Sequence, residues 1–440
     1  MKSKIRIGCG AGFSGDRVEP AVVLAQKGEL DYLVLECLAE RTIALAQKRK
    51  MQDASKGYDP LLERRIESLL PIIASNKIRL ITNMGAANPI VAAQLICQIA
   101  QRLHVVVRVA AITGDDVFSQ LTGEELVYET GRPIKESGRL ISANAYLGID
   151  ALLPALATDA DIIITGRVAD PSLFVAPLVY EFGWSSHAYE KIGQATLIGH
   201  LLECAGQLTG GYFADPGKKD VPDLANLGHP FADVSADGTA VFSKVEGTGG
   251  SLNLATVKEQ LLYEVMDPSQ YLTPDVIADF TGVYLQQIGT NQIKAWGAGG
   301  QDKPSTLKVS VGYEAGFVGE GEISYAGSNA LERAQLAGKI IEQRLRGSFS
   351  DLRIDYIGST SVHRKTFGVY TAPYEIRLRV AGKATTADQA ALIGQEVEAL
   401  YTNGPAGGGG ARKYVQEVIG INSTFISREM VSPFVTLVNS

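Results

Sequence analysis

The sequence predicts an α/β protein with a parallel β/α sheet in an N-terminal lobe and an α+β C-terminal lobe. Over the first 170 or so residues, short apolar runs rich in β-branched residues alternate with helical patterns. Runs that are largely apolar, such as DIIIT at residues 161–165, suit strands buried on both faces of a parallel sheet. From residue 306 the patterns follow the order βαββαβ, which is typical of ferredoxin-like domains.

Length and composition place the chain among soluble globular proteins. Its 440 residues exceed one compact domain, and we divide them into a parallel α/β lobe (1–213), a hairpin-rich connecting region (214–305) and an α+β lobe (306–440). Hydrophobic residues make up 45% and charged residues 20%, which argues against disorder. The formal net charge of -7 argues against a nucleic-acid or anionic-membrane partner.

The N-terminal lobe is predicted from five repeats of a strand followed by helical structure. The strands are expected at 4–10, 31–37, 78–85, 104–113 and 161–169, and the helices that follow four of them at 18–28, 38–50, 88–103 and 171–183. A long helical pattern over 189–211 leaves this lobe and ends on Gly210 and Gly211.

The elements predicted after residue 213 are two β-hairpins and the mixed strands and helices of the C-terminal lobe. Residues 231–247 and 283–299 each resemble a β-hairpin, with one helix over 256–265 between them. In the C-terminal lobe we expect strands at 306–314 with 321–327, 351–359, 374–384 and 415–423, and helices at 330–347 and 386–404.

Polar residues cluster where the predicted parallel strands end. Loops after the carboxyl ends of parallel strands line one crevice, in which ligands bind. The candidates there are Asp16, Arg17, Glu36, Asn83, Gly85, Arg167 and Asp170. An alternative role for Asp16, Asp115 and Asp170 is to cap a helix or an Asx turn.

The first glycine-rich loop follows the first strand. Gly10, Gly12 and Gly15 match the GxGxxG pattern, and Glu36 ends the next strand where a dinucleotide-binding fold places its ribose acid, so a nicotinamide site is one interpretation. Against it, Asp16, Arg17 and then Pro20 follow the third glycine, which predicts a helix that begins too late to hold a pyrophosphate. Binding of another anion is the alternative.

A second glycine-rich loop lies near the C-terminus. Gly407, Gly408, Gly409 and Gly410 are consecutive, and Arg412 follows closely. Successive backbone N–H groups of this kind form anion-binding nests, which a nearby guanidinium reinforces. A flexible linker is the other interpretation.

Metal and targeting signals are sparse. The four cysteines and five histidines occur singly, so no zinc is expected; magnesium or manganese would be held by Asp115 and Asp116. The first residues lack a long apolar stretch and no later run reaches about 20 apolar residues, so we expect a cytoplasmic protein with no membrane partner.

Long motifs then point to a family. GCGAGFSGDR, LDYLVLECLAERT, GYDPLL, TNMGAANP, TGRVADPSLF, LLECAGQLTGGYFADP, KVEGTGG, TVKEQLLYEV and GPAGGGG resemble the acyclic terpene utilisation AtuA family over nearly the whole chain. The resemblance implies a catabolic enzyme acting on a branched 3-hydroxyacyl-CoA, or a related small carboxylate, as a carbon–carbon lyase or hydro-lyase. CoA would enter as part of the substrate.

The resemblance also suggests roles for the candidate residues. The glycine loops with Arg17, Arg167 and Arg412 would meet the phosphates and the enolate oxygen of a CoA thioester, and Glu36 or Asp170 would act as the base once burial raises its pKa. Two other functions stay open: an NAD(P)-dependent oxidoreductase that uses the GxGxxG loop, and a non-catalytic subunit of a catabolic complex.

Partners are expected from the same resemblance. Longer members of the family carry a small AtuA-like ferredoxin-fold module at the C-terminus, and this chain stops shortly after GPAGGGG, so a separate small protein is expected to supply that module. Apolar helices on the surface favour a homo-oligomer.

Overall fold

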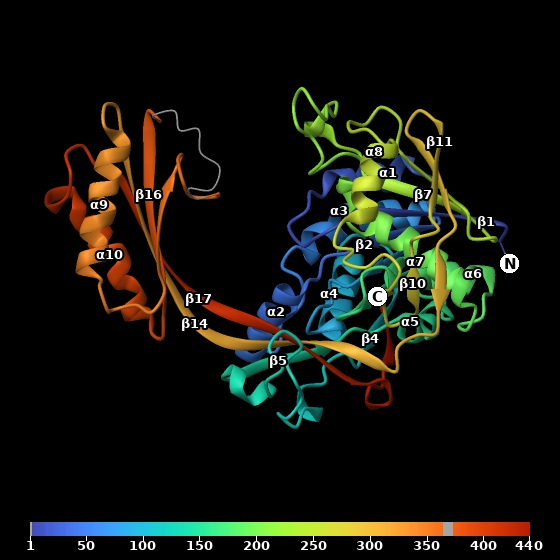
Figure 1. Ribbon diagram of the computed structural model, residues 1–440. Coiled ribbons are helices and arrows are strands. Elements are labelled where there is room, and N and C mark those ends of the chain that lie inside the picture. Colours follow the sequence, from blue (N-terminus) through green and yellow to red (C-terminus); the bar gives the residue numbers. More distant parts are fainter. Residues whose placement is uncertain (1, 364–372) are drawn as a thin grey trace. The chain divides into compact units, whose positions relative to one another are not determined.

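The computed structural model describes residues 2–363 and 373–440 and contains two compact units (Figure 1). The first comprises Met1–Gly312 and Ile421–Ser440, and the second comprises Tyr313–Gly420. Ten α-helices within the described residues combine with a large mixed sheet that includes parallel strands, so the predicted α/β class is confirmed. No helix in this described part is long and apolar enough to cross a membrane.

A ten-stranded sheet forms the centre of the first unit. Its strand order is β11-β12-β8-β7-β1-β2-β3-β6-β4-β18. Five neighbours in it are parallel, namely β1 (Lys4–Ala11), β2 (Tyr32–Leu35), β3 (Arg79–Thr82), β6 (Ile162–Thr165) and β4 (Arg108–Thr113). Each of them overlaps one of the five predicted strand segments, with β1 one residue longer than predicted, and their carboxyl ends share one edge of the sheet.

Helices cover both faces of these strands (Figure 1). One face packs against α1 (Glu19–Lys27), α3 (Leu62–Asn76) and α4 (Pro89–Arg102), and the other against α5 (Ile149–Leu156), α6 (Ser172–Phe182) and α7 (Tyr189–Glu203). Alternate residues of β2 serve the two faces: Leu33 and Leu35 join the first core, whereas Tyr32 and Val34 join the second. Burial on both faces explains why the residues of these strands are mostly apolar.

Antiparallel strands extend the same sheet at both edges. Next to β1 lie β7 (Pro230–Ser235), β8 (Ala240–Lys244), β12 (Gln292–Trp296) and β11 (Tyr284–Gly289), which form the two predicted hairpins. At the other edge, β18 (Phe434–Asn439) pairs antiparallel with β4. The remaining elements of this unit are α2 (Glu40–Gln52), β5 (Leu140–Ala145), α8 (Leu254–Leu262) and a small sheet of β9 (Tyr271–Leu272), β10 (Ile277–Asp279) and β13 (Gly299–Gln301).

The second unit is built from six elements in the order βαββαβ. These are β14 (Thr306–Ala326), α9 (Ala330–Arg344), β15 (Leu352–Ile357), β16 (Glu375–Ala384), α10 (Ala387–Asn403) and β17 (Gly409–Ser427). The strands have the order β15-β16-β14-β17, and Ile323, Leu378 and Val397 lie in a core shared by strands and helices. The two segments predicted at 306–314 and 321–327 are one continuous strand, whose first residues belong to the first unit.

Candidate functional site

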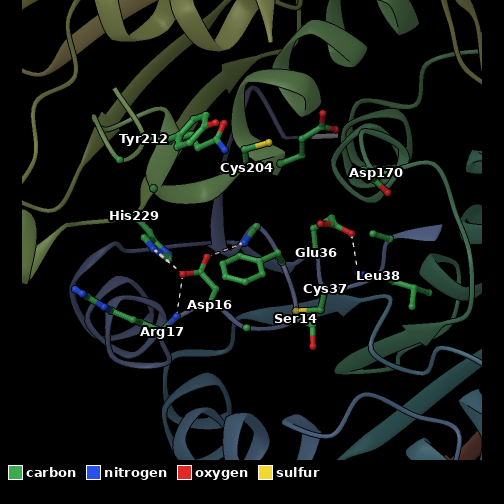
Figure 2. A pocket seen from close by; sticks show the side chains of 18 of the residues that line it. Ser14, Asp16, Arg17, Glu36, Cys37, Leu38, Asp170, Cys204, Tyr212 and His229 are labelled. Carbon is green, nitrogen blue, oxygen red and sulfur yellow. Dashed lines mark hydrogen bonds and ion pairs between the residues drawn. The ribbon is translucent and has the colours of Figure 1, made fainter. Parts of the chain in front are cut away.

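A pocket of about 830 Å³ opens at the carboxyl ends of β1 and β2, entirely within the first unit (Figure 2). Its walls are the loop after β1, the loop after β2, Asp170 after β6, the end of α7 and the segment after α8. Of the predicted site residues, it brings together Gly12, Gly15, Asp16, Arg17, Glu36 and Asp170. This is the position at which ligands bind in open parallel sheets.

Glu36 is a nearly buried acid in this pocket. It follows the last residue of β2, and its backbone N–H donates to the Ala11 carbonyl, which ties the two loops together. Its Oε1 accepts hydrogen bonds from the Leu38 N–H and from Asn83 Nδ2, each at 2.9 Å. Burial raises the pKa of Glu36 well above its usual range, and the negative charge of Asp170 raises it further.

Asp170 faces the pocket beside a buried arginine. Its Oδ1 lies 3.1 Å from Nη2 of Arg167, which is 2% exposed and stacks over the Tyr146 ring at 4.1 Å. Burial raises the pKa of Asp170, and the Arg167 charge opposes that rise. Nε and Nη1 of Arg167 have no hydrogen-bond partner within the described residues. This guanidinium is buried behind the pocket lining, where an electrostatic interaction with Asp170 is strong.

Glu203 is a third acid of the pocket that the sequence reasoning missed. It ends α7, whose residues from Ile192 onward are buried on every side, so no polar face marks it in the sequence. Burial raises the pKa of Glu203 well above its usual range, and Asp170 adds to this. Its Oε1 lies 3.2 Å from Nδ1 of His200, whose own pKa burial lowers to about 4. Burial thus favours the uncharged form of both groups.

Glu40 behaves differently from these acids although it lines the same pocket. Burial alone would raise its pKa, but the Arg167 charge, the Tyr146 hydroxyl and Lys308 lower it to about 2. Tyr146 donates a hydrogen bond to Glu40, and Lys308 Nζ lies 3.2 Å from it. The pocket thus combines a carboxyl group whose pKa is lowered with carboxyl groups whose pKa values are raised.

The first glycine-rich loop binds its own carboxylate. Asp16 Oδ2 accepts a hydrogen bond from the Gly12 N–H at 3.0 Å, and its Oδ1 accepts one from the Arg17 N–H at 2.8 Å. His229 lies against the same loop, with Nε2 3.9 Å from Asp16 (Figure 2). The buried Arg65 donates to the Ser14 and Asp16 carbonyls from the opposite side. The predicted late helix start is confirmed, since α1 begins at Glu19.

Close packing explains two of the three glycines. A Cβ on Gly12 would lie 2.6 Å from the backbone carbonyl carbon of Cys204, and one on Gly10 would lie 2.7 Å from Leu35 and 2.9 Å from Ala21. At Gly15 the atoms nearest to an added Cβ belong to the ring of Phe13, which is exposed and can move away. Gly10 and Gly12 are therefore required by the contacts of β1 with α1 and with the residue after α7.

Asn83 and Gly85 lie after β3 and support the pocket from behind. Asn83 is fully buried; its Nδ2 donates to Glu36, and its Oδ1 accepts from the Cys37 N–H at 2.7 Å. A Cβ on Gly85 would lie 2.7 Å from the Thr165 carbonyl oxygen at the end of β6. In this structure Asn83 orients Glu36, and Gly85 allows two strand ends to approach.

The predicted metal ligands have protein partners. Asp115 Oδ2 accepts hydrogen bonds from Asn144 at 2.8 Å and from the Arg167 N–H at 2.9 Å, while Asp116 accepts from Gln47 Nε2 at 3.0 Å. Over residues 2–363 and 373–440, no group of three or more histidine, cysteine or acidic side chains is arranged to hold a metal ion. Asp115 thus links β4 to the loop that carries Arg167.

Replacement of Asp115 by Asn is expected to change how stability depends on pH. Burial raises the pKa of Asp115 to about 6, so the folded state binds its proton more tightly than the unfolded state. The proton on Asp115 therefore adds roughly 3 kcal/mol to the free energy of unfolding below about pH 4. This stabilisation is lost as the pH rises through about 6. Urea unfolding at pH 4.5 and 7.5 should show Asp115→Asn gaining stability relative to the original protein at the higher pH. An equal difference in stability between the two proteins at pH 4.5 and pH 7.5 would contradict a raised pKa for Asp115.

The second glycine-rich loop lies in the second unit. Gly407 and Gly410 have φ of 75° and 66°, and β17 begins at Gly409. Arg333 donates to the Ala406 carbonyl at 2.7 Å and so holds the start of the loop, and Arg412 is exposed. Anion binding by Gly407–Gly410 and Arg412 remains a prediction.

Comparison with known proteins gives one result. No curated protein and no solved structure shows a significant match. A family described as acyclic terpene utilisation family protein AtuA matches residues 5–437, which includes every residue of the pocket. The resemblance inferred from the motifs is thus confirmed, and the chain belongs to the AtuA family of acyclic terpene utilisation proteins.

Proposed function

We propose that the chain is a catabolic enzyme of acyclic terpene utilisation that acts on a branched 3-hydroxyacyl-CoA, or a related small carboxylate, as a carbon–carbon lyase or hydro-lyase. Family membership supports the pathway class. The observation that carries the chemistry is the pair of acids Glu36 and Asp170, which come from different strand ends and face one pocket, where the charge of Asp170 raises the pKa of Glu36.

The surroundings assign different tasks to the two acids. Asp170 lies 3.1 Å from the Arg167 guanidinium, which stabilises its ionised form. Glu36 is more deeply buried, with 7% of its surface exposed, and holds its proton to higher pH. Environments that separate two carboxyl pKa values in this way define an acid and a base. Asp170 is accordingly the general base and Glu36 the general acid.

Both proposed reactions use this pair. In a dehydration, Asp170 removes the proton from the carbon next to the thioester carbonyl while Glu36 protonates the leaving 3-hydroxyl, which departs as water. In a carbon–carbon cleavage, Asp170 takes the 3-hydroxyl proton, the bond between carbons 2 and 3 breaks, and Glu36 protonates the resulting enolate carbon. Arg167 balances the negative charge that develops beside it.

The phosphates of a CoA thioester require a cation at the pocket mouth. Arg17 is exposed, lines the pocket and also lines a neighbouring pocket of about 560 Å³ together with Lys27. Its Nη1 donates to the Ala225 carbonyl, which fixes the guanidinium between the two openings. We therefore assign Arg17 to phosphate binding. A dinucleotide fits the loop less well because Asp16 already accepts from the Gly12 N–H.

A pH profile tests the assignment of the acid. Since Glu36 acts in its protonated form, kcat should fall as pH rises through its elevated pKa. The Asn83 amide donates to Glu36 and lowers that pKa, so Asn83→Leu should move the alkaline limb to higher pH. Turnover of a branched 3-hydroxyacyl-CoA, followed by mass spectrometry of the products, gives the measurement. An alkaline limb at the same pH in both proteins would show that Glu36 is not the acid.

A further inference from the structure

Strand β17 forms one edge of the sheet in the second unit. In the described part of the chain the strand order is β15-β16-β14-β17, so β17 has a neighbouring strand on its β14 side only (Figure 1). Every residue from 412 to 417 is exposed. An exposed edge presents a row of backbone N–H and C=O groups to which another strand can pair. Such an edge is either protected against pairing or used for it.

This edge has little protection and carries apolar side chains. Residues 409–420 contain no proline, which is a common means of blocking an edge strand. Tyr414 is 52% exposed and Val415 is 44% exposed. Tyr401 on α10, itself half-exposed, lies beside the strand, because its hydroxyl accepts a hydrogen bond from the Ala411 N–H at 2.9 Å. These three side chains form an apolar border along the edge.

The charges on the edge are of opposite sign and follow the strand period. Lys413 faces α10, since its Nζ lies 2.5 Å from Glu398 and a Cβ on Gly394 would lie 2.5 Å from its own Cβ. Val415 and Glu417 are two and four residues further on, so they lie on the same face of the strand. That face therefore presents a cation, an apolar group and an anion in succession, and the reverse succession when it is followed backwards.

Antiparallel pairing of two copies matches this row to itself. With a two-fold axis at Val415, that residue lies opposite its own counterpart, and Lys413 of each copy lies opposite Glu417 of the other. Opposite residues of antiparallel strands have Cβ atoms about 4.5–5.5 Å apart, within reach of an ion pair. Moving the axis by one residue would place Lys413 opposite Val415 or Ile419, so only the axis at Val415 joins the opposite charges.

We propose that β17 is a homodimer interface, in which residues 411–419 of two copies pair antiparallel about Val415 and the sheets of the two second units become continuous. Charges of one sign on this edge would repel a second copy, whereas Lys413 and Glu417 attract it twice. A two-fold axis uses the same edge in both copies, so assembly ends at the dimer. The inference is independent of the proposed reaction, because these residues belong to the second unit and do not line the acid-lined pocket.

Reversal of the two charges tests the interface. Lys413→Glu and Glu417→Lys should each weaken the dimer of the full chain at least about tenfold, because the axis repeats every like-charged contact. An equimolar mixture of the two variants should dimerise again, since both contacts between unlike copies then join a carboxylate to an ammonium group. Loss of the bond from Lys413 to Glu398 is the same in the variant alone and in the mixture, so only a contact between copies explains recovery. Sedimentation velocity at micromolar concentrations gives the dissociation constants.

Lys383→Glu is the matched control for charge. Lys383 is on β16, which has strands on both sides, and its side chain is 72% exposed. The same reversal there should leave the dissociation constant within about twofold. A chain that stays monomeric at micromolar concentrations would overturn the proposal. A dimer that survives both single reversals, or a mixture of the two variants that remains monomeric, would overturn it as well.

Discussion

Replacement of Glu36 by Gln is expected to lower kcat by at least about 100-fold, the usual contribution of a positioned general acid. The amide has the same shape and still accepts at Oε1 from Leu38 and Asn83, so the pocket should keep its structure. It has no acidic proton to give to the leaving hydroxyl or to the enolate carbon. Steady-state kinetics with a branched 3-hydroxyacyl-CoA, together with the melting temperature, gives the measurement.

The control for this variant is Glu29→Gln. Glu29 has a side chain that is 86% exposed and lies outside the pocket, so the same chemical change should leave kcat within twofold. A Glu36→Gln protein that turned over at the original rate would exclude Glu36 as the proton donor.

Replacement of Gly12 by Ala is expected to destabilise the first unit by about 2–3 kcal/mol, in the upper part of the range for overpacking. The added methyl would lie 2.6 Å from the carbonyl carbon and 2.8 Å from Cα of Cys204, and both are backbone atoms that cannot rotate away. The loop would move off α7 and weaken the bond from the Gly12 N–H to Asp16. Urea-induced unfolding and the melting temperature measure the effect.

Gly299→Ala provides the comparison for this change. A Cβ at Gly299 would meet Asp279 and Glu190 at 3.6 Å, which is ordinary van der Waals contact. This variant should remain within about 0.5 kcal/mol of the original protein. Equal stability of Gly12→Ala and Gly299→Ala would show that the glycine loop does not depend on its contact with Cys204.

The parallel strands could be predicted because burial on both faces leaves a strong pattern. Runs such as Ile162–Thr165 and Tyr32–Leu35 are almost entirely apolar, and the predicted segments contain these two strands. Helix α3 was not predicted although it spans Leu62–Asn76 and buries Leu62, Ile66, Leu69 and Ile73 at helical spacing. Pro71 inside the helix and the polar run Glu63–Arg65 interrupt the apolar pattern of this segment.

Only the site residues at the ends of the parallel strands could be predicted from the sequence. Glu36 and Asp170 were found because residues at the carboxyl ends of parallel strands converge. Glu203 was missed because it lies in a helix whose neighbours are buried, and its place in the pocket depends on how α7 crosses the sheet. Glu203 and Glu36 are far apart in the sequence, and no local pattern indicates that both line the same pocket.

The GxGxxG pattern shows how one motif can answer two physical demands. Glycine permits close approach of a backbone to a phosphate, and it equally permits close approach of one backbone to another. In this chain Gly10 and Gly12 contact Ala21, Leu35 and Cys204, and the carboxylate of Asp16 occupies the Gly12 N–H. The glycine spacing alone does not distinguish a phosphate-binding loop from a loop that packs against another backbone. The Asp16–Arg17 pair that follows the third glycine does distinguish them.

The strand that covers β4 has a consequence for biosynthesis. Arg108 on β4 bonds to Asn439 on β18, which the ribosome adds 331 residues later. At a translation rate of about 5–20 residues per second, the edge of β4 stays unpaired for roughly 20–60 s before β18 is synthesised. During that interval the unpaired N–H and C=O groups of β4 are available for pairing with other strands, so expression of this protein should depend on chaperones that shield exposed strands until β18 has been synthesised.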